Sequence, residues 1–130
     1  MVIGAVLELF EDDISKPKSK FSIVVGINSS SIATVFINTL SYYDDLAPSL
    51  QALNCPISPS ECAFLDHDSY VDCSELKVRD KTKINNILQK DKYRQKWILT
   101  GSKINQILSM VKNAKSISPS IKTEFGLKKD

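Results

Sequence analysis

The sequence has little cysteine, almost no histidine and no long apolar run. Its three cysteines, Cys55, Cys62 and Cys73, are seven and eleven positions apart. That spacing fits neither a disulfide framework nor paired Cys-x-x-Cys zinc knuckles. The one histidine, His67, has no second histidine with which to build a metal site. No window approaches the roughly 18 apolar residues needed to cross a membrane. We therefore expect reduced thiols, no metal, no cofactor and no membrane segment.

Size and composition favour one folded domain. The 130 residues are 42% hydrophobic and 25% charged, which is typical of a globular core and unlike a disordered chain. The apolar run 1–7 lacks the basic residues that open a secretory signal, and acidic residues follow it directly. We interpret this run as the start of a strand, and we expect a cytoplasmic protein.

Charge is divided unevenly along the chain, although the net charge is only +2. Residues 1–76 hold three lysines against eleven Asp or Glu residues, a balance of −8. Residues 77–130 hold fourteen Lys or Arg residues against four acids, a balance of +10. A basic half is typical of a surface that binds nucleic acid. Two simpler explanations stay open: the halves neutralise each other in space, or the lysines only solvate helix faces.

The first forty residues have the pattern of antiparallel strands. An apolar run over residues 2–10 is followed by FSIVVGIN over 21–28, a continuous run rich in β-branched residues. A short NSSS turn joins it to IATVFIN over 32–38, so the two runs are expected to pair as a hairpin. Residues 39–61 then form a long excursion with three prolines, the kind of loop that often binds a partner.

The most informative run is DSYVDCSELKVRDKTKI, residues 68–84. Its alternation predicts a strand followed by a second alternating stretch with interleaved basic residues. Asp80 stands where an acidic residue caps the first turn of a helix. Positive charge at such a rim suits a phosphate backbone, while a solvated rim is the alternative. The candidate RNA-binding residues of this basic comb are Lys77, Arg79, Lys81 and Lys83.

Two helices are expected after this run. The first carries apolar residues at 84, 87 and 88, and the second follows Thr100. The apolar stripe of the second helix consists of Ile104, Ile107, Leu108 and Val111. Residues 116–130 contain Pro119 and end in a charged stretch, so a flexible tail is expected there. The sequence thus predicts an α+β protein with one domain over 1–115.

The order of these elements and the run 68–84 resemble the PemK/MazF family of toxin ribonucleases. FSIVVGIN is similar to the second strand of that family and ATVFINT to its third, so the resemblance covers about residues 2–112. It implies a small antiparallel SH3-like β-barrel with C-terminal helices, usually a homodimer, that cleaves single-stranded RNA without a metal. The implied partners are single-stranded RNA and a cognate antitoxin bound across the groove between the strands and the 39–61 loop. The matching positions in the run are Ser69, Val71, Cys73, Val78, Asp80, Lys81 and Ile84.

The resemblance also implies roles for residues beside the second and third strands. Family members carry an Arg-Pro pair before the second strand, where this chain has Lys20-Phe21 with Lys18 nearby. Lysine is a point charge where arginine is a planar fork, but preorganised positive charge is the main requirement of phosphoryl chemistry. Thr39 matches the Ser or Thr that ends the third strand of the family. Lys20 and Thr39 are therefore the candidate catalytic residues, and Lys18 is a candidate RNA ligand.

Other interpretations of these residues stay open. Thr39 also fits a strand-end residue that bonds its own turn, and the two lysines fit a solvated loop. His67 fits a loop position or a general acid or base. Tyr42 or Tyr43 fits a platform on which bases stack. For the whole protein, the rivals are a barrel that binds RNA or protein without cleavage, and a different small barrel such as a phage- or plasmid-encoded inhibitor.

Overall fold

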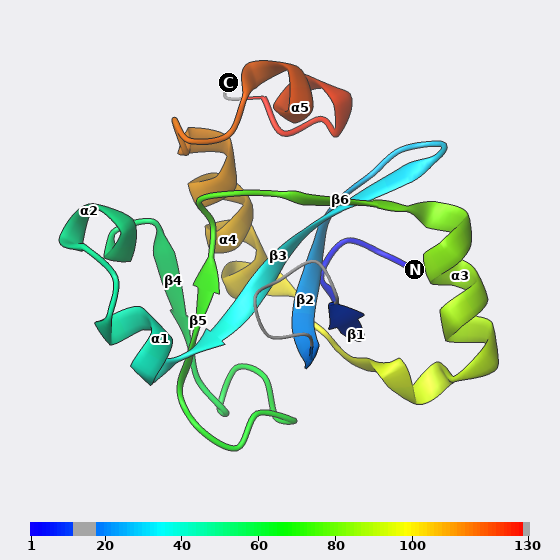
Figure 1. Cartoon of the computed structure of the whole chain (residues 1–130), viewed down its shortest axis with the longest axis horizontal. Coiled ribbons are helices and arrows are strands. Elements are labelled where there is room, and N and C mark those ends of the chain that lie inside the picture. Colours follow the sequence, from blue (N-terminus) through cyan, green and yellow to red (C-terminus); the bar gives the residue numbers. More distant parts are fainter. Residues whose placement is uncertain (12–17, 129–130) are drawn as a thin grey trace.

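The computed structural model describes residues 1–11 and 18–128 (Figure 1). Among these residues, no helix combines the length and the apolar character of a membrane span. The helices and strands, in chain order, are β1 (Ala5–Glu11), β2 (Lys18–Ile27), β3 (Ser31–Thr39), α1 (Leu40–Asp44), α2 (Pro48–Gln51), β4 (Asn54–Ile57), β5 (Ser69–Asp72), β6 (Lys77–Asp80), α3 (Lys81–Lys90), the 3-10 turn η1 (Lys92–Arg94), β7 (Gln95–Ile98), α4 (Gly101–Asn113) and α5 (Pro119–Glu124).

The described strands form one antiparallel sheet whose centre is β3. The order is β4-β5-β3-β2-β1-β7, and β6 also pairs with β3. The end of β3 at residues 37–39 pairs with β5, whereas its start at residues 31–34 pairs with β6. Residues 73–76 carry the chain from one partner to the other (Figure 1). The outcome is a mixed α/β fold with a curled antiparallel half-barrel sheet, which confirms the predicted combination of antiparallel strands and helices.

The two faces of the sheet bury separate cores, because successive side chains of a strand point to opposite faces. Val6 of β1 belongs to the larger core, which α4 covers, and its neighbours Ala5 and Leu7 belong to the smaller one. Ile84 of α3 closes the smaller core. Figure 1 shows α3 and α4 on different sides of the sheet. The α4 residues buried in the larger core are Ile104, Ile107 and Val111, while Leu108 is half-buried.

Residues 116–128 differ from the flexible tail expected from the sequence. Ser118 caps α5, since its hydroxyl accepts a hydrogen bond from the Ile121 amide at 3.3 Å. Phe125 and Leu127 are buried in the larger core. Phe125 packs so closely over Gly26 of β2 that a Cβ atom on that glycine would lie 2.7 Å from the Phe125 Cβ. The segment therefore belongs to the folded domain, because its apolar residues have a face of the sheet to cover.

The excursion over residues 39–61 is also more ordered than its prolines suggested. It contains the two short helices α1 and α2 and the edge strand β4. Pro48 begins α2, where proline is favoured because the first helical amide needs no partner. Pro56 lies on β4, at the edge of the sheet, where its missing amide is tolerated. Two of the three prolines in this segment therefore mark a helix start and a sheet edge.

Replacing Ile107 with alanine should lower the free energy of unfolding by about 2–5 kcal/mol, because the fully buried side chain leaves a cavity under α4. Urea unfolding measures the loss, and Asn105→Ala on the exposed side of the same helix is the matched control. If α4 packs only within one chain, the loss stays constant over a hundredfold range of protein concentration. A loss that varies with concentration would place this stripe at an interface between two copies.

Candidate functional site

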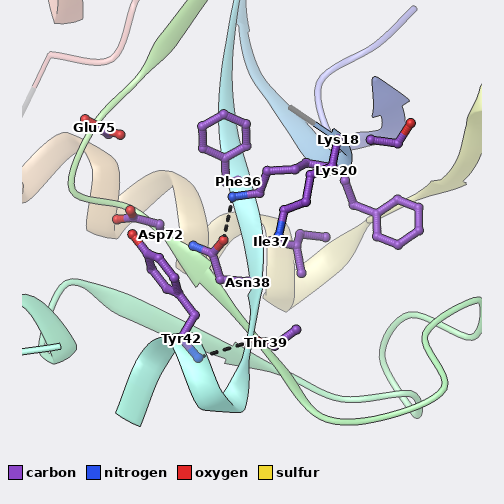
Figure 2. A pocket seen from close by; sticks show the side chains of 11 residues that line it. Lys18, Lys20, Phe36, Ile37, Asn38, Thr39, Tyr42, Asp72 and Glu75 are labelled. Carbon is purple, nitrogen blue, oxygen red and sulfur yellow. Dashed lines mark hydrogen bonds between the residues drawn. The ribbon is translucent and has the colours of Figure 1, made fainter. Parts of the chain in front are cut away.

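A groove with a volume of about 530 Å³ opens where β2, β3 and α1 meet. It is lined by residues 18–21 of β2 and 36–39 of β3. Tyr42 of α1 and the carboxylates of Asp72 and Glu75 complete the lining (Figure 2). Its volume is within the usual range for ligand sites. The lining residues that the sequence singled out are Lys18, Lys20, Thr39 and Tyr42.

The Lys20 ammonium is held at one place in this groove. Its Nζ donates a hydrogen bond to the Asn38 Oδ1 at 2.8 Å, and Figure 2 shows this contact beneath the Phe36 ring. The same Nζ lies 4.3 Å from the Phe36 ring centroid and 5.8 Å from that of Tyr42. Burial lowers the pKa of Lys20, and the Lys18 charge lowers it further, while Asp72 opposes the change. Lys20 is thus a fixed and partly desolvated cation.

Thr39 lies at the edge of the groove as the N-cap of α1. Its Oγ1 accepts a hydrogen bond from the Tyr42 amide at 3.3 Å and lies 3.1 Å from the Ser41 hydroxyl. Thr39 therefore bonds its own turn, which was one of the two interpretations of this residue. Thr39 is still among the residues that line the groove, so the cap fixes the orientation of its hydroxyl at the groove edge.

One of the two neighbouring tyrosines faces the groove and the other does not. Tyr43 stacks on Tyr70, with ring centroids 3.8 Å apart and the ring planes 5° from parallel. Tyr42 is 48% exposed and lines the groove together with Phe36. Tyr42 is therefore the tyrosine placed to stack on a ligand.

The groove residues that the sequence interpretation missed include Phe36, Asn38 and Asp72. Asn38 is as buried as its neighbour Ile37, so a polar residue near the end of an apolar strand was the signal that could have found it and Phe36, two positions before it. Asp72 is the last residue of β5 and points to the same face of the sheet as Asn38. Asn38 pairs with Tyr70, and Asp72 lies two positions after Tyr70 on the same strand. The Asp72 Oδ1 accepts bonds from the Ser74 amide at 2.9 Å and the Ser74 hydroxyl at 2.5 Å. The groove therefore holds acidic as well as basic groups.

The sequence placed Arg79 in a basic comb that either binds RNA or forms a solvated rim, but in the structure the Arg79 side chain is largely buried. Its side chain is 10% exposed and forms a two-pronged ion pair with Glu11, which is 3% exposed. Nη1 lies 3.1 Å from the Glu11 Oε2, Nη2 contacts Oε1, and Nε donates to the Thr34 Oγ1 at 3.0 Å. The guanidinium carbon also lies 5.9 Å from the Phe36 ring centroid. The Arg79 side chain on β6 thus links β1 through Glu11 and β3 through Thr34.

The other residues of the basic comb lie outside the lining of the groove. Lys77 pairs with Thr34 across the sheet, and its carbonyl accepts a bond from the Thr34 hydroxyl at 3.1 Å. The Lys81 Nζ donates to the Asn28 carbonyl at 3.1 Å, and Lys83 is exposed on α3. Asp80 caps α3 as the sequence predicted, since its Oδ1 accepts a bond from the Lys83 amide at 3.1 Å. RNA contact by these lysines stays a prediction.

The three thiols are buried in the core around α4. Burial raises the pKa of Cys73 to about 12 and that of Cys62 to about 11. Burial also raises the pKa of Cys55. Thiols in this state are poor nucleophiles and poor metal ligands. In the part of the chain that the structure describes, no group of His, Cys, Asp and Glu side chains is arranged to hold a metal ion.

Comparisons with known proteins identify no family for this chain. No protein-family model matches it. No curated protein matches it either. The PemK/MazF resemblance therefore stays a hypothesis that rests on the motif over residues 68–84.

The lowered pKa of Lys20 predicts a specific pH dependence of stability. Because the folded state binds the Lys20 proton less tightly than the unfolded state, the ammonium destabilises the fold at neutral pH. This penalty disappears as the pH rises toward the ordinary value of 10.5. Relative to Lys20→Met, the parent should therefore gain unfolding free energy between neutral pH and pH 10.5. Chemical unfolding at several pH values measures the difference, and a constant difference would contradict the desolvation of Lys20.

Removing Arg79 should damage the fold rather than ligand binding. Arg79→Met leaves the Glu11 carboxylate buried without its partner, which should lower the free energy of unfolding by about 3–5 kcal/mol. The double variant Glu11→Leu, Arg79→Met removes both charges and should recover most of that loss. Urea unfolding of the parent, the single variant and the double variant tests this. Equal stability of all three proteins would contradict a structural role for Arg79 and would favour its role as an RNA ligand.

Proposed function

We propose that this groove binds single-stranded RNA and cleaves it. The observation that carries the proposal is the Lys20 ammonium, which is fixed by Asn38 and lies against the Phe36 and Tyr42 rings. Sites for single-stranded nucleic acid combine positive charge for the phosphates with aromatic rings on which the bases stack. The groove brings these two components together within one continuous lining.

The binding roles follow from the chemistry of each side chain. Lys18 and Lys20 supply two cations for consecutive phosphates, and Tyr42 supplies a ring for a base. Asn38 gives its Oδ1 to Lys20, and the amide nitrogen carries donors for a base edge. RNA bound in this way would lie along the ends of β2 and β3.

Cleavage in such a site needs no metal ion. The ribose 2′-oxygen bonds to phosphorus, the bond from phosphorus to the 5′-oxygen breaks, and the products are a 2′,3′-cyclic phosphate and a 5′-hydroxyl. Lys20 would neutralise the charge that grows on the phosphoryl oxygens. Its lowered pKa also makes the ammonium a better proton donor to the leaving 5′-oxygen. The Thr39 hydroxyl, held by the α1 cap, would orient the attacking group.

The sheet topology is compatible with the wider proposal of an SH3-like barrel. In the curled sheet, β3 pairs with β2 on one edge and with β5 and β6 on the other. We propose on this basis that the chain is a PemK/MazF-like toxin and forms a homodimer. The cognate antitoxin would cover the groove and the 39–61 excursion, where α1 presents Tyr42 beside the site.

A second candidate is a barrel that binds without cleavage. The observation that favours it is the presence of Asp72 and Glu75 in the same lining as the two lysines. Two carboxylates repel a polyanion and suit a protein segment of mixed charge. Lys20 stands where the family has an arginine, and lysine lacks the planar fork that holds phosphoryl oxygens. This difference also favours binding without cleavage.

Substitution of Lys20 distinguishes the two functions. If the protein is a ribonuclease, the purified parent cleaves a mixed single-stranded RNA pool in the presence of EDTA. Lys20→Ala should lower the rate by roughly 10²–10³-fold, because one preorganised charge is lost, and Thr39→Ala should also lower it. Lys20→Arg keeps the charge and should retain part of the activity. Lys115→Ala, an exposed lysine beyond α4, is the matched control.

Gel analysis of the end-labelled RNA pool gives the rates and shows the product ends. Binding of the RNA by the parent without cleavage, even at high protein concentration, would favour the second candidate. Absence of both binding and cleavage would contradict the RNA function itself.

A further inference from the structure

A second hollow of about 210 Å³ adjoins the groove along the end of β3. It shares four lining residues with the groove: Phe21, Ile37, Asn38 and Thr39. Its other lining residues come from the segment that leads into β5. The two hollows therefore share part of their lining at the end of β3, with Lys20 lining one hollow and His67 lining the other. Thr39 lies on the boundary that both hollows share.

The segment that carries His67 is anchored on both sides of the histidine. Phe64 packs edge-on against Phe21 of β2, with ring centroids 4.8 Å apart. On the other side, the Ser69 hydroxyl lies 3.4 Å from the His67 carbonyl, and Ser69 pairs with Thr39 across the sheet. These contacts hold the backbone of His67 against the end of β3. The imidazole is thus placed beside the groove by the fold and not by a free loop.

The imidazole has a defined acceptor. The His67 Nδ1 contacts the Asp66 Oδ1, and the His67 side chain remains 57% exposed. A carboxylate accepts the Nδ1 proton, so the neutral ring carries its lone pair on Nε2. An acidic residue on Nδ1 can orient a histidine that acts as a base, although the Asp66 side chain is itself 90% exposed and not buried as in a Ser-His-Asp triad. Among the described residues that line this hollow, Asp66 is the other ionisable side chain.

We propose that His67 is the general base of the cleavage reaction, an inference that rests on the proposed ribonuclease function. Nε2 takes the proton of the 2′-hydroxyl as the 2′-oxygen bonds to phosphorus. The bond to the 5′-oxygen breaks, and that oxygen takes a proton from the Lys20 ammonium. The imidazolium and the neutral amine then return to their starting forms by exchange with water. Asp66 is a positioning residue, because it acts on the reaction only through His67.

Asp72 fits the role of base less well, although it lines the groove. Its Oδ1 accepts two hydrogen bonds from Ser74, and it faces the same part of the groove as Lys20. A base and an acid must act on opposite sides of the phosphorus, because the attacking and leaving oxygens are in line. His67 and Lys20 line different hollows that share Thr39, so a phosphate bound at that boundary would have one of these groups on each side.

The chain offers a direct spectroscopic test, because it contains one histidine. In protein without an affinity tag, the imidazole Cε1–H signal in a proton NMR spectrum belongs to His67. A single-stranded 2′-deoxy oligonucleotide lacks the attacking hydroxyl and serves as an uncleavable probe. We expect it to shift the His67 signal and to change the pH midpoint of its titration. Inorganic phosphate at the same ionic strength is the control for a general charge effect.

Kinetics of variants test the chemical role. His67→Gln should lower the cleavage rate by about 10²–10⁴-fold while leaving oligonucleotide affinity within a factor of about three of the parent. The rising limb of the pH–rate profile should disappear with it. Added imidazole should restore part of the activity of His67→Ala. Asp68→Asn, which changes a neighbouring charge outside the lining, should keep the parent rate and profile.

The outcomes separate the two proposals. A parent that cleaves RNA at the same rate and with the same profile as His67→Gln overturns the role of His67 and leaves the ribonuclease function standing. An oligonucleotide that shifts other signals but not that of His67 also overturns it. A parent that neither binds nor cleaves RNA contradicts the proposed function, and the base role is overturned with it.

Discussion

The fold depends on the two-sided pairing of β3. One edge of this strand is filled by β2, and the other edge is shared by β5 and β6, which the chain reaches through residues 73–76. Buried backbone groups must be paired, so both partners are required for a strand of this length in the interior. The division also affects the groove. β5 brings Asp72 to it, while β6 brings Arg79 to the middle of the same face.

That face of the sheet is divided into three zones. Under α3 it is apolar, with Val24 and Ile32 packed against Ile84. In the middle, Arg79 and Glu11 form a buried polar cluster. Beyond the cluster the face opens, and Lys20 and Phe36 line the groove. A buried ion pair is costly unless its hydrogen bonds are satisfied, and Thr34 completes those of Arg79. The cluster therefore ends the apolar core where the site begins.

Periodicity predicted the elements better than it predicted the environment of single charges. The hairpin of β2 and β3, the Asp80 cap and the buried stripe of α4 all follow from local spacing. Arg79 was misplaced, because its partner Glu11 lies 68 positions away and no local pattern connects them. The tail was misjudged for a related reason: Phe125 is covered by contact with Gly26, which is distant in sequence. Lys18, Lys20 and Thr39 did come together, since the hairpin places the start of β2 beside the end of β3.

The setting of Lys20 also affects its reactivity toward electrophiles. The free amine, and not the ammonium, attacks an acyl donor, so a lysine with a lowered pKa is the better nucleophile at neutral pH. Lys20 is half-buried but lines an open groove, so a small reagent can reach it. Acetylation there would remove the charge that lies against Phe36. The desolvation that accompanies the fixed position of this lysine thus also increases the share of its reactive free amine at neutral pH.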